Sequence, residues 1–199
     1  MASTPCLIPT GAEFDTLLEA YGLTPADGVE FPVPGSLITR PPAGKVGVYP
    51  KTFDAGLRLP LTNFQEEILR CCGCSVQMLT LDAIHKVVAF EMICRANGII
   101  PDYFVFKYFF RFPATNDKYT FSARRGGHNL VLDNKPPKNY QEKWVWVNHE
   151  LLGRDHPRAV MPFETIPKLF PHNQQLRISC VLFKWMLMLC RRLSLPELV

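Results

Sequence analysis

The sequence of 199 residues predicts an α+β fold, with a mainly helical core around one central buried helix at about residues 81–96. Two observations support this. Hydrophobic residues make up 47% of the chain and charged residues 20%, which is typical of a globular protein with a real core. Residues 81–96 are apolar over more than half of the helix circumference, the pattern of a helix surrounded by other elements. A small antiparallel sheet and then a C-terminal helix are expected after it.

The first expected helix covers residues 11–21. Thr10 and Glu13 have the spacing of a capping box, in which a hydroxyl bonds a helical N–H and the Glu reaches back. Gly22 can serve as the residue that ends the helix. Apolar residues then recur at helical spacing, namely Phe14, Leu17, Leu18 and Tyr21.

Residues 24–44 are rich in proline and glycine and are expected to be extended. A short strand at Val46–Tyr49 and one helical turn at Thr52–Ala55 follow. Thr62 and Gln65 form a second capping box, which opens a helix to about Cys71. The residues expected to face inward there are Phe64, Ile68 and Leu69.

Gly73 is expected to end the helix that begins at Thr62. Thr80 is expected to cap the central helix, and Asn97-Gly98 is expected to end the central helix. Its expected core residues are Leu81, Ala83, Ile84, Val87, Val88, Phe90, Met92 and Cys94.

The run from Tyr103 to Phe112 contains seven aromatic residues, and Pro101-Asp102 can start a helix there. We expect a helix to about Phe109 and then a strand. The run could also be a base-stacking platform, but basic residues are few, so core packing is favoured. Further strands are expected at 118–123, 129–132 and 144–147, with a turn at Arg125–His128.

Seven cysteines is an odd number, and the N-terminus lacks the pattern of a secretory signal. Reduced thiols in the cytoplasm or nucleus are therefore expected, with no secretion. Cys71 and Cys74 form a C-x-x-C pair that could supply two zinc ligands. The nearest further candidates, His85 and Cys94, sit in the predicted core helix, so free thiols at a helix end are favoured. No cofactor or small-molecule ligand is indicated.

The net charge of +4 permits a nucleic-acid partner without requiring one. Candidate phosphate contacts are Lys118, Arg124, Arg125 and His128, around the expected turn. The competing interpretation is that these are ordinary solvated side chains on a hairpin tip.

None of the common catalytic patterns is present: there is no G-x-S-x-G elbow and no phosphate-binding loop. A metal-dependent nuclease or transposase would need carboxylates, and the scattered candidates are Asp54, Asp82, Glu91 and Asp102.

Several stretches carry a resemblance to a known family. They are Val46–Tyr49, the Phe53–Leu61 stretch with its Gly-Leu-Arg-Leu-Pro-Leu, Val87–Gly98 leading to Pro101 and Phe104, the aromatic run to Phe112, and Trp144 within Lys143–Trp146. Taken together, residues from about 31 to about 146 resemble a plant gypsy-type transposon domain, also described as plant transposon protein. This resemblance implies the gag-like N-terminal region of a retrotransposon. It carries over no catalytic residue.

These observations lead to an expected division into an N-terminal helical extension (1–28), a plant transposon domain (29–150), and a Pro-containing linker with an apolar C-terminal helix (151–199). The expected function is a non-enzymatic interaction or assembly module, with self-association and nucleic-acid contact as its candidate activities. The alternative is a metal-dependent transposase-like or nuclease-like enzyme of a mobile element. A third hypothesis places the apolar segment Ile178–Cys190, which is too short to span a bilayer comfortably, at a membrane surface or partner interface.

Overall fold

The computed structural model describes residues 11–112, 114–115, 118–124, 140–141 and 143–153. Within them the fold is mixed α+β with a helical majority and small antiparallel pairs of strands, which confirms the predicted fold class. The elements in chain order are α1 (Gly11–Tyr21), η1 (Pro25–Asp27), β1 (Lys45–Val48), α2 (Lys51–Asp54), α3 (Asn63–Cys72), η2 (Val76–Met78), α4 (Leu81–Ala96), α5 (Tyr103–Phe109), β2 (Phe110–Arg111), β3 (Ala114–Thr115), β4 (Lys118–Tyr119), β5 (Ser122–Ala123), β6 (Val145–Asn148) and η3 (His149–Leu152).

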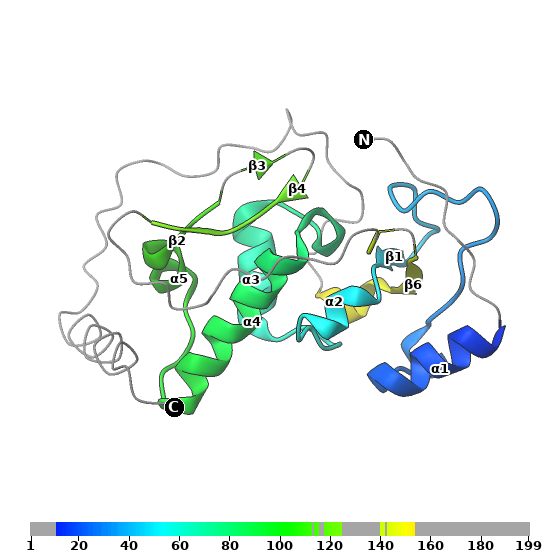
Figure 1. Cartoon of the computed structure of the whole chain (residues 1–199), viewed down its shortest axis with the longest axis horizontal. Helices are drawn as coiled ribbons and strands as arrows, with labels where there is room; N and C mark the ends of the chain where they lie inside the picture. Colours follow the sequence, from blue (N-terminus) through cyan, green and yellow to red (C-terminus); the bar gives the residue numbers. More distant parts are fainter. Residues whose placement is uncertain (1–10, 113, 116–117, 125–139, 142, 154–199) are drawn as a thin grey trace, which may run out of the picture.

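Helix α4 lies at the centre of the molecule in contact with α3, with α5 on one side and α2 and the β1–β6 pair towards the other end (Figure 1). Seven of the eight core residues predicted for this helix are buried. The prediction for Met92 is wrong, since its side chain is 66% exposed. Two charged residues, Lys86 and Glu91, are buried in the same helix because each has hydrogen-bonding partners of opposite charge.

Local capping signals set the helix boundaries. The Thr62 hydroxyl accepts a hydrogen bond from the Gln65 amide N–H at 3.3 Å, and the Thr80 hydroxyl accepts one from Ala83 N–H at 3.1 Å. Gly73 ends α3 with a left-handed φ of 63°, which glycine adopts without steric cost. The second half of the predicted Thr62–Gln65 box is wrong, because the Gln65 side chain points away to Glu91.

The aromatic run follows the predicted change from helix to strand. The Asp102 carboxylate accepts hydrogen bonds from the N–H groups of Phe104 and Val105, and the helix ends at Phe109 before β2 begins. Most of the run packs inside, as expected: Phe106 makes edge contacts with Phe90, at 5.2 Å between ring centroids, and with Phe121, at 4.8 Å. The buried members of the run are Tyr103, Phe106, Phe109 and Phe110.

The sequence suggested one small sheet after the helices, and this prediction is wrong. They form three separate antiparallel pairs, β1–β6, β2–β5 and β3–β4. In the first pair Val46 faces Val147, a partner about a hundred residues away in the chain. Residues 118–123 are not one strand, because the Phe121 ring packs into the core and its carbonyl accepts a hydrogen bond from Lys86, which separates β4 from β5.

Helix α1 packs on the same core. The Tyr21 hydroxyl donates a 2.7 Å hydrogen bond to Asp54, and the ring of Phe14 lies 3.8 Å from that of Phe31 between centroids. Leu23 and Leu152 also belong to this core, while the domain boundaries after residues 28 and 150 stay predictions.

The expected cap Thr10, the turn at 125–128, the strand at 129–132 and the C-terminal helix lie outside the described residues. Among the helices that the structure describes, none is long and apolar enough to cross a membrane.

Candidate nucleic-acid interface

The structure gives different surroundings to the two described phosphate-contact candidates. The Lys118 ammonium donates a 2.6 Å hydrogen bond to the Gln77 carbonyl and lies 4.8 Å from the centroid of the Tyr49 ring. Its charge therefore helps to attach β4 to η2. Arg124 is exposed, and its Nε donates a 2.9 Å hydrogen bond to the Lys107 carbonyl. Arg125 and His128 lie outside the described residues.

Two aromatic residues of α5 face solvent while their neighbours are buried. The side chain of Phe104 is 37% exposed and that of Tyr108 is 47% exposed. Residues four apart lie on one face of a helix, with about 6 Å between them along the axis. The sequence missed this division, although the spacing of the two positions was a visible signal for it.

Two exposed arginines belong to the β2–β5 pair, and β2 directly follows α5 in the chain. Arg111 faces Ser122 in the register of this pair, and Arg124 lies two residues beyond Ser122. Pairing continues there, since Arg124 N–H donates to the Phe109 carbonyl at 3.0 Å. Side chains at such diagonal positions share one face of the ladder, with roughly 7–8 Å between the residues. Among the described residues, Arg111 has no hydrogen-bond or ion-pair partner for its guanidinium.

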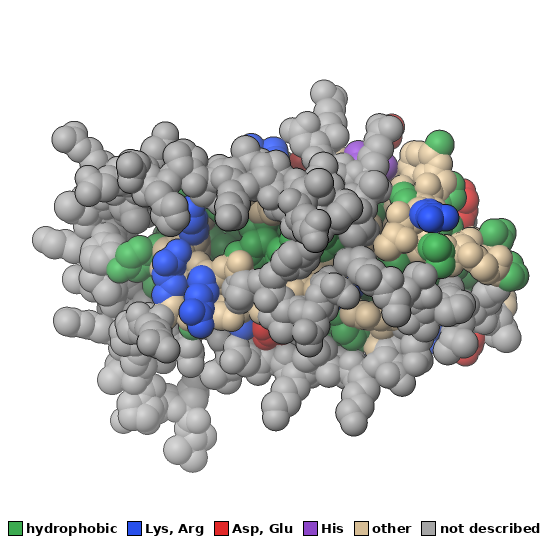
Figure 2. All heavy atoms as spheres, turned by 90° about the horizontal axis from the view of Figure 1, so that it is seen from above, with side chains coloured by type: hydrophobic (Ala, Val, Ile, Leu, Met, Phe, Trp, Pro, Cys, Tyr) green, Lys and Arg blue, Asp and Glu red, His purple; other side chains and the backbone are tan. Residues whose placement is uncertain are grey.

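Further positive charge comes from α5 and from the end of α3. The Lys107 ammonium lies 6.0 Å from the centroid of the Tyr103 ring. Burial raises the pKa of the Cys71 thiol, and the nearby charges of Arg70 and Lys107 act in the opposite direction. The negative charge of Glu67 also raises the pKa of this thiol. Figure 2 shows Lys and Arg side chains gathered at this end of the molecule, next to an exposed hydrophobic group.

We call this surface the basic–aromatic face and define it by five residues: Phe104, Lys107, Tyr108, Arg111 and Arg124. It combines the two features that single-stranded nucleic-acid sites share, aromatic rings for stacking and cations for phosphates. The residues come from one helix and one strand pair, and the Arg124–Lys107 hydrogen bond holds these two elements together.

The C-x-x-C pair lies at the end of α3. Cys71 is half-buried in the last turn and Cys74 is fully buried just after it. The thiols of Cys72 and Cys74 are hydrogen-bonded to each other, which together with burial raises the pKa of Cys72 well above its ordinary value. His85 and Cys94, the other zinc candidates, lie on α4. No group of three metal-ligating side chains occurs in the described part of the chain.

The four candidate carboxylates lie on different elements or turns, and each has a structural partner. Asp54 accepts from Tyr21 and Lys51, Asp82 from Lys86, and Asp102 caps α5. Glu91 accepts from Arg95 and Gln65. None of these contacts brings two of the four together.

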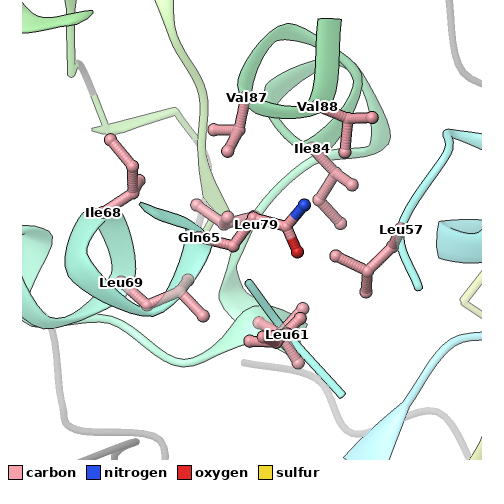
Figure 3. Close-up of a pocket in the computed structure, with 10 residues that line it drawn as sticks. Leu57, Leu61, Gln65, Ile68, Leu69, Leu79, Ile84, Val87 and Val88 are labelled. Atoms are coloured by element: carbon pink, nitrogen blue, oxygen red, sulfur yellow. The ribbon is translucent and has the colours of Figure 1, made fainter. Parts of the chain in front are cut away.

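An apolar cavity lies between α3, α4 and the segment after α2 (Figure 3). Its volume is about 20 Å³, and aliphatic side chains such as Leu61, Ile84 and Val88 line it. The Gln65 amide enters it, and the carbonyl oxygen of that amide has no hydrogen-bond partner. This space is too small for an organic ligand.

No protein-family model matches the chain, and neither a curated protein nor a solved structure matches it significantly. The candidate site therefore rests on geometry and charge.

Proposed function

We propose that this chain is a non-enzymatic, retrotransposon-derived plant protein that works as an interaction or assembly module. Its basic–aromatic face contacts nucleic acid, and self-association accompanies this contact. Support comes from the resemblance of residues 31–146 to a plant gypsy-type transposon domain, and from the face itself. The two supports overlap at the aromatic run, which contains Arg111, whereas Arg124 lies outside the motifs that carry the resemblance.

The observation that carries the nucleic-acid contact is the diagonal pair Arg111 and Arg124. Both are exposed on one face of the β2–β5 ladder, and the Arg124 side chain bonds the Lys107 carbonyl. Guanidinium groups bind phosphate oxygens with two parallel hydrogen bonds, which makes arginine well suited to this contact. Positive charge concentrated on one face releases counterions from a nucleic acid, so the affinity must fall as salt rises.

The test is the salt dependence of binding, measured by fluorescence anisotropy with a labelled RNA or DNA oligonucleotide. Arg111→Gln removes one charge from the face without breaking a hydrogen bond within the described residues. Loss of one phosphate contact lowers the slope of log affinity against log salt by about 0.7 for a single strand and about 0.9 for a duplex.

Arg40→Gln is the matched control. Arg40 is also exposed, and it belongs to the loop between α1 and β1, at the opposite end of the molecule from α5 (Figure 1). The expected result is a normal slope for Arg40→Gln and a reduced slope for Arg111→Gln. A protein that binds no oligonucleotide at low salt contradicts the nucleic-acid contact, and a strictly monomeric protein at high concentration contradicts self-association.

The non-enzymatic part of the proposal has its own test. Incubation of the protein with oligonucleotides and Mg²⁺ or Mn²⁺ is expected to leave them intact. Metal-dependent cleavage that copurifies with the wild-type protein would contradict it, and would favour the mobile-element enzyme instead.

A further inference from the structure

The basic–aromatic face carries two exposed rings, Phe104 and Tyr108, in addition to its positive charge. We infer that this face binds single-stranded nucleic acid in preference to a duplex, with each of the two rings stacked on one base. This inference rests on the proposed nucleic-acid contact and adds the class of strand that the face selects.

The spacing of the two rings favours an unpaired strand. Positions 104 and 108 are separated by about 6 Å along the α5 axis. Successive bases in one strand of a B-form duplex are only about 3.4 Å apart, and their faces are already stacked on each other. Both rings can therefore stack on neighbouring bases only when the strand is extended and its bases are free.

The exposure of both rings is also informative. A single exposed aromatic residue is ordinary on a protein surface. Here two rings lie four residues apart on one short helix, with Arg111 and Arg124 on the adjoining strand pair. Stacking rings next to cations that follow the backbone is the arrangement by which proteins bind single strands without reading their sequence.

Charge along α5 indicates where the phosphates lie. Asp102 caps the N-terminal end of the helix, so the end near Phe104 carries a carboxylate. The positive groups gather at the other end, where the Arg124 guanidinium bonds to the Lys107 carbonyl and Arg111 follows in β2. A bound strand would therefore place its phosphates along the arginines and extend its bases over the two rings.

The experiment compares wild-type affinities for a labelled 12-nucleotide single strand, as DNA and as RNA, and for the matching 12-base-pair DNA duplex at the same salt. We expect the single strands to bind at least about tenfold tighter than the duplex. Phe104→Leu and Tyr108→Leu should each lower the single-strand affinity about 5- to 150-fold, since stacking contributes about 1–3 kcal/mol per base. The same substitutions should leave the weak duplex affinity unchanged.

Two control variants separate stacking from other effects. Tyr108→Phe keeps the ring and is expected to bind single strands as the wild type does. Ile100→Ala removes an 87% exposed aliphatic side chain just before α5 and should change neither affinity. A thermal unfolding midpoint near the wild-type value shows that a variant is folded. If Tyr108→Leu does not fold, Tyr108→Phe is the folded variant at this position.

The outcomes distinguish this inference from the function on which it rests. Salt-dependent binding that is equal for single strand and duplex, with Phe104→Leu and Tyr108→Leu both neutral, overturns the inference and retains the proposed contact. Duplex binding tighter than single-strand binding overturns it as well. Failure of the wild type to bind either form overturns the proposed contact and the inference together.

Discussion

The side-chain amide of Gln65 donates a 2.8 Å hydrogen bond from Nε2 to Oε2 of Glu91 and so joins α3 to α4 inside the core. The side chain of Glu91 is only 4% exposed. Its other oxygen accepts two hydrogen bonds from Arg95, at 3.0 Å from Nε and 2.7 Å from Nη2. A buried carboxylate is stable only when its charge is compensated, so these contacts are expected to determine stability at this helix pair.

Arg95→Gln is therefore predicted to lower the free energy of unfolding by about 1–2 kcal/mol, since it leaves the Glu91 charge buried without its cation. This loss of unfolding free energy is smaller than for a fully buried ion pair, because the Arg95 side chain is 61% exposed and water screens its charge. Urea denaturation measures the change. A double variant that adds Glu91→Gln should lose less than the sum of the two single variants. Additive losses would show that the two residues do not interact.

Lys118 is predicted to matter for stability and not for nucleic-acid binding. Its ammonium bonds the Gln77 carbonyl and lies over the Tyr49 ring, so Lys118→Met should destabilise the protein by about 1–2 kcal/mol. The salt slope of oligonucleotide binding should stay at the wild-type value, in contrast to Arg111→Gln. A slope reduced as much as by Arg111→Gln would place Lys118 in the interface, as the sequence analysis suggested.

Tyr21 is predicted to make stability depend on alkaline pH. Burial and the hydrogen bond to Asp54 raise its pKa from 10.0 to about 12, so the folded state keeps a proton that the unfolded state loses. This contribution is complete below pH 10 and is lost as the pH rises to about 12. Urea unfolding between pH 8 and pH 12 tests it: the stability difference between the wild type and Tyr21→Phe should decrease over that range. A constant difference would contradict the assignment.

The four described cysteines are predicted to differ in reactivity. The Cys71 thiol is half-buried, whereas Cys72, Cys74 and Cys94 are buried, and burial raises the pKa of Cys94 to about 11. Brief alkylation of the native protein with iodoacetamide, followed by peptide mass spectrometry, should label Cys71 first among these four. Equal labelling of all four in the folded protein would contradict this arrangement.

The sequence predicted the features that depend on neighbouring residues. Thr62, Thr80 and Asp102 cap the helices that they were expected to cap, and Gly73 ends α3, because each of these contacts forms within a few residues. The change from helix to strand at Phe110 was predicted from periodicity in the same way.

Features that depend on tertiary packing were not predictable from these signals. The β1–β6 pair joins residues about a hundred positions apart, and no local pattern specifies that partner. Gln65 looked like half of a capping box, yet the buried charge of Glu91 attracts its amide more strongly. Met92 fits the apolar pattern of α4, but its side chain is exposed to solvent. For the candidate site, the sequence indicated Arg124, and it offered the Tyr103–Phe112 run as a base-stacking platform but favoured core packing, without separating the exposed Phe104 and Tyr108 from their buried neighbours.

The most direct test of the basic–aromatic face is ultraviolet cross-linking of the wild-type protein to a single-stranded oligonucleotide, with the modified residues identified by mass spectrometry. Stacked rings cross-link efficiently because they touch the bases, so the account predicts cross-links at Phe104 or Tyr108, and their loss in excess unlabelled single strand. Reproducible cross-links confined to residues outside α5 and the β2–β5 pair would contradict it.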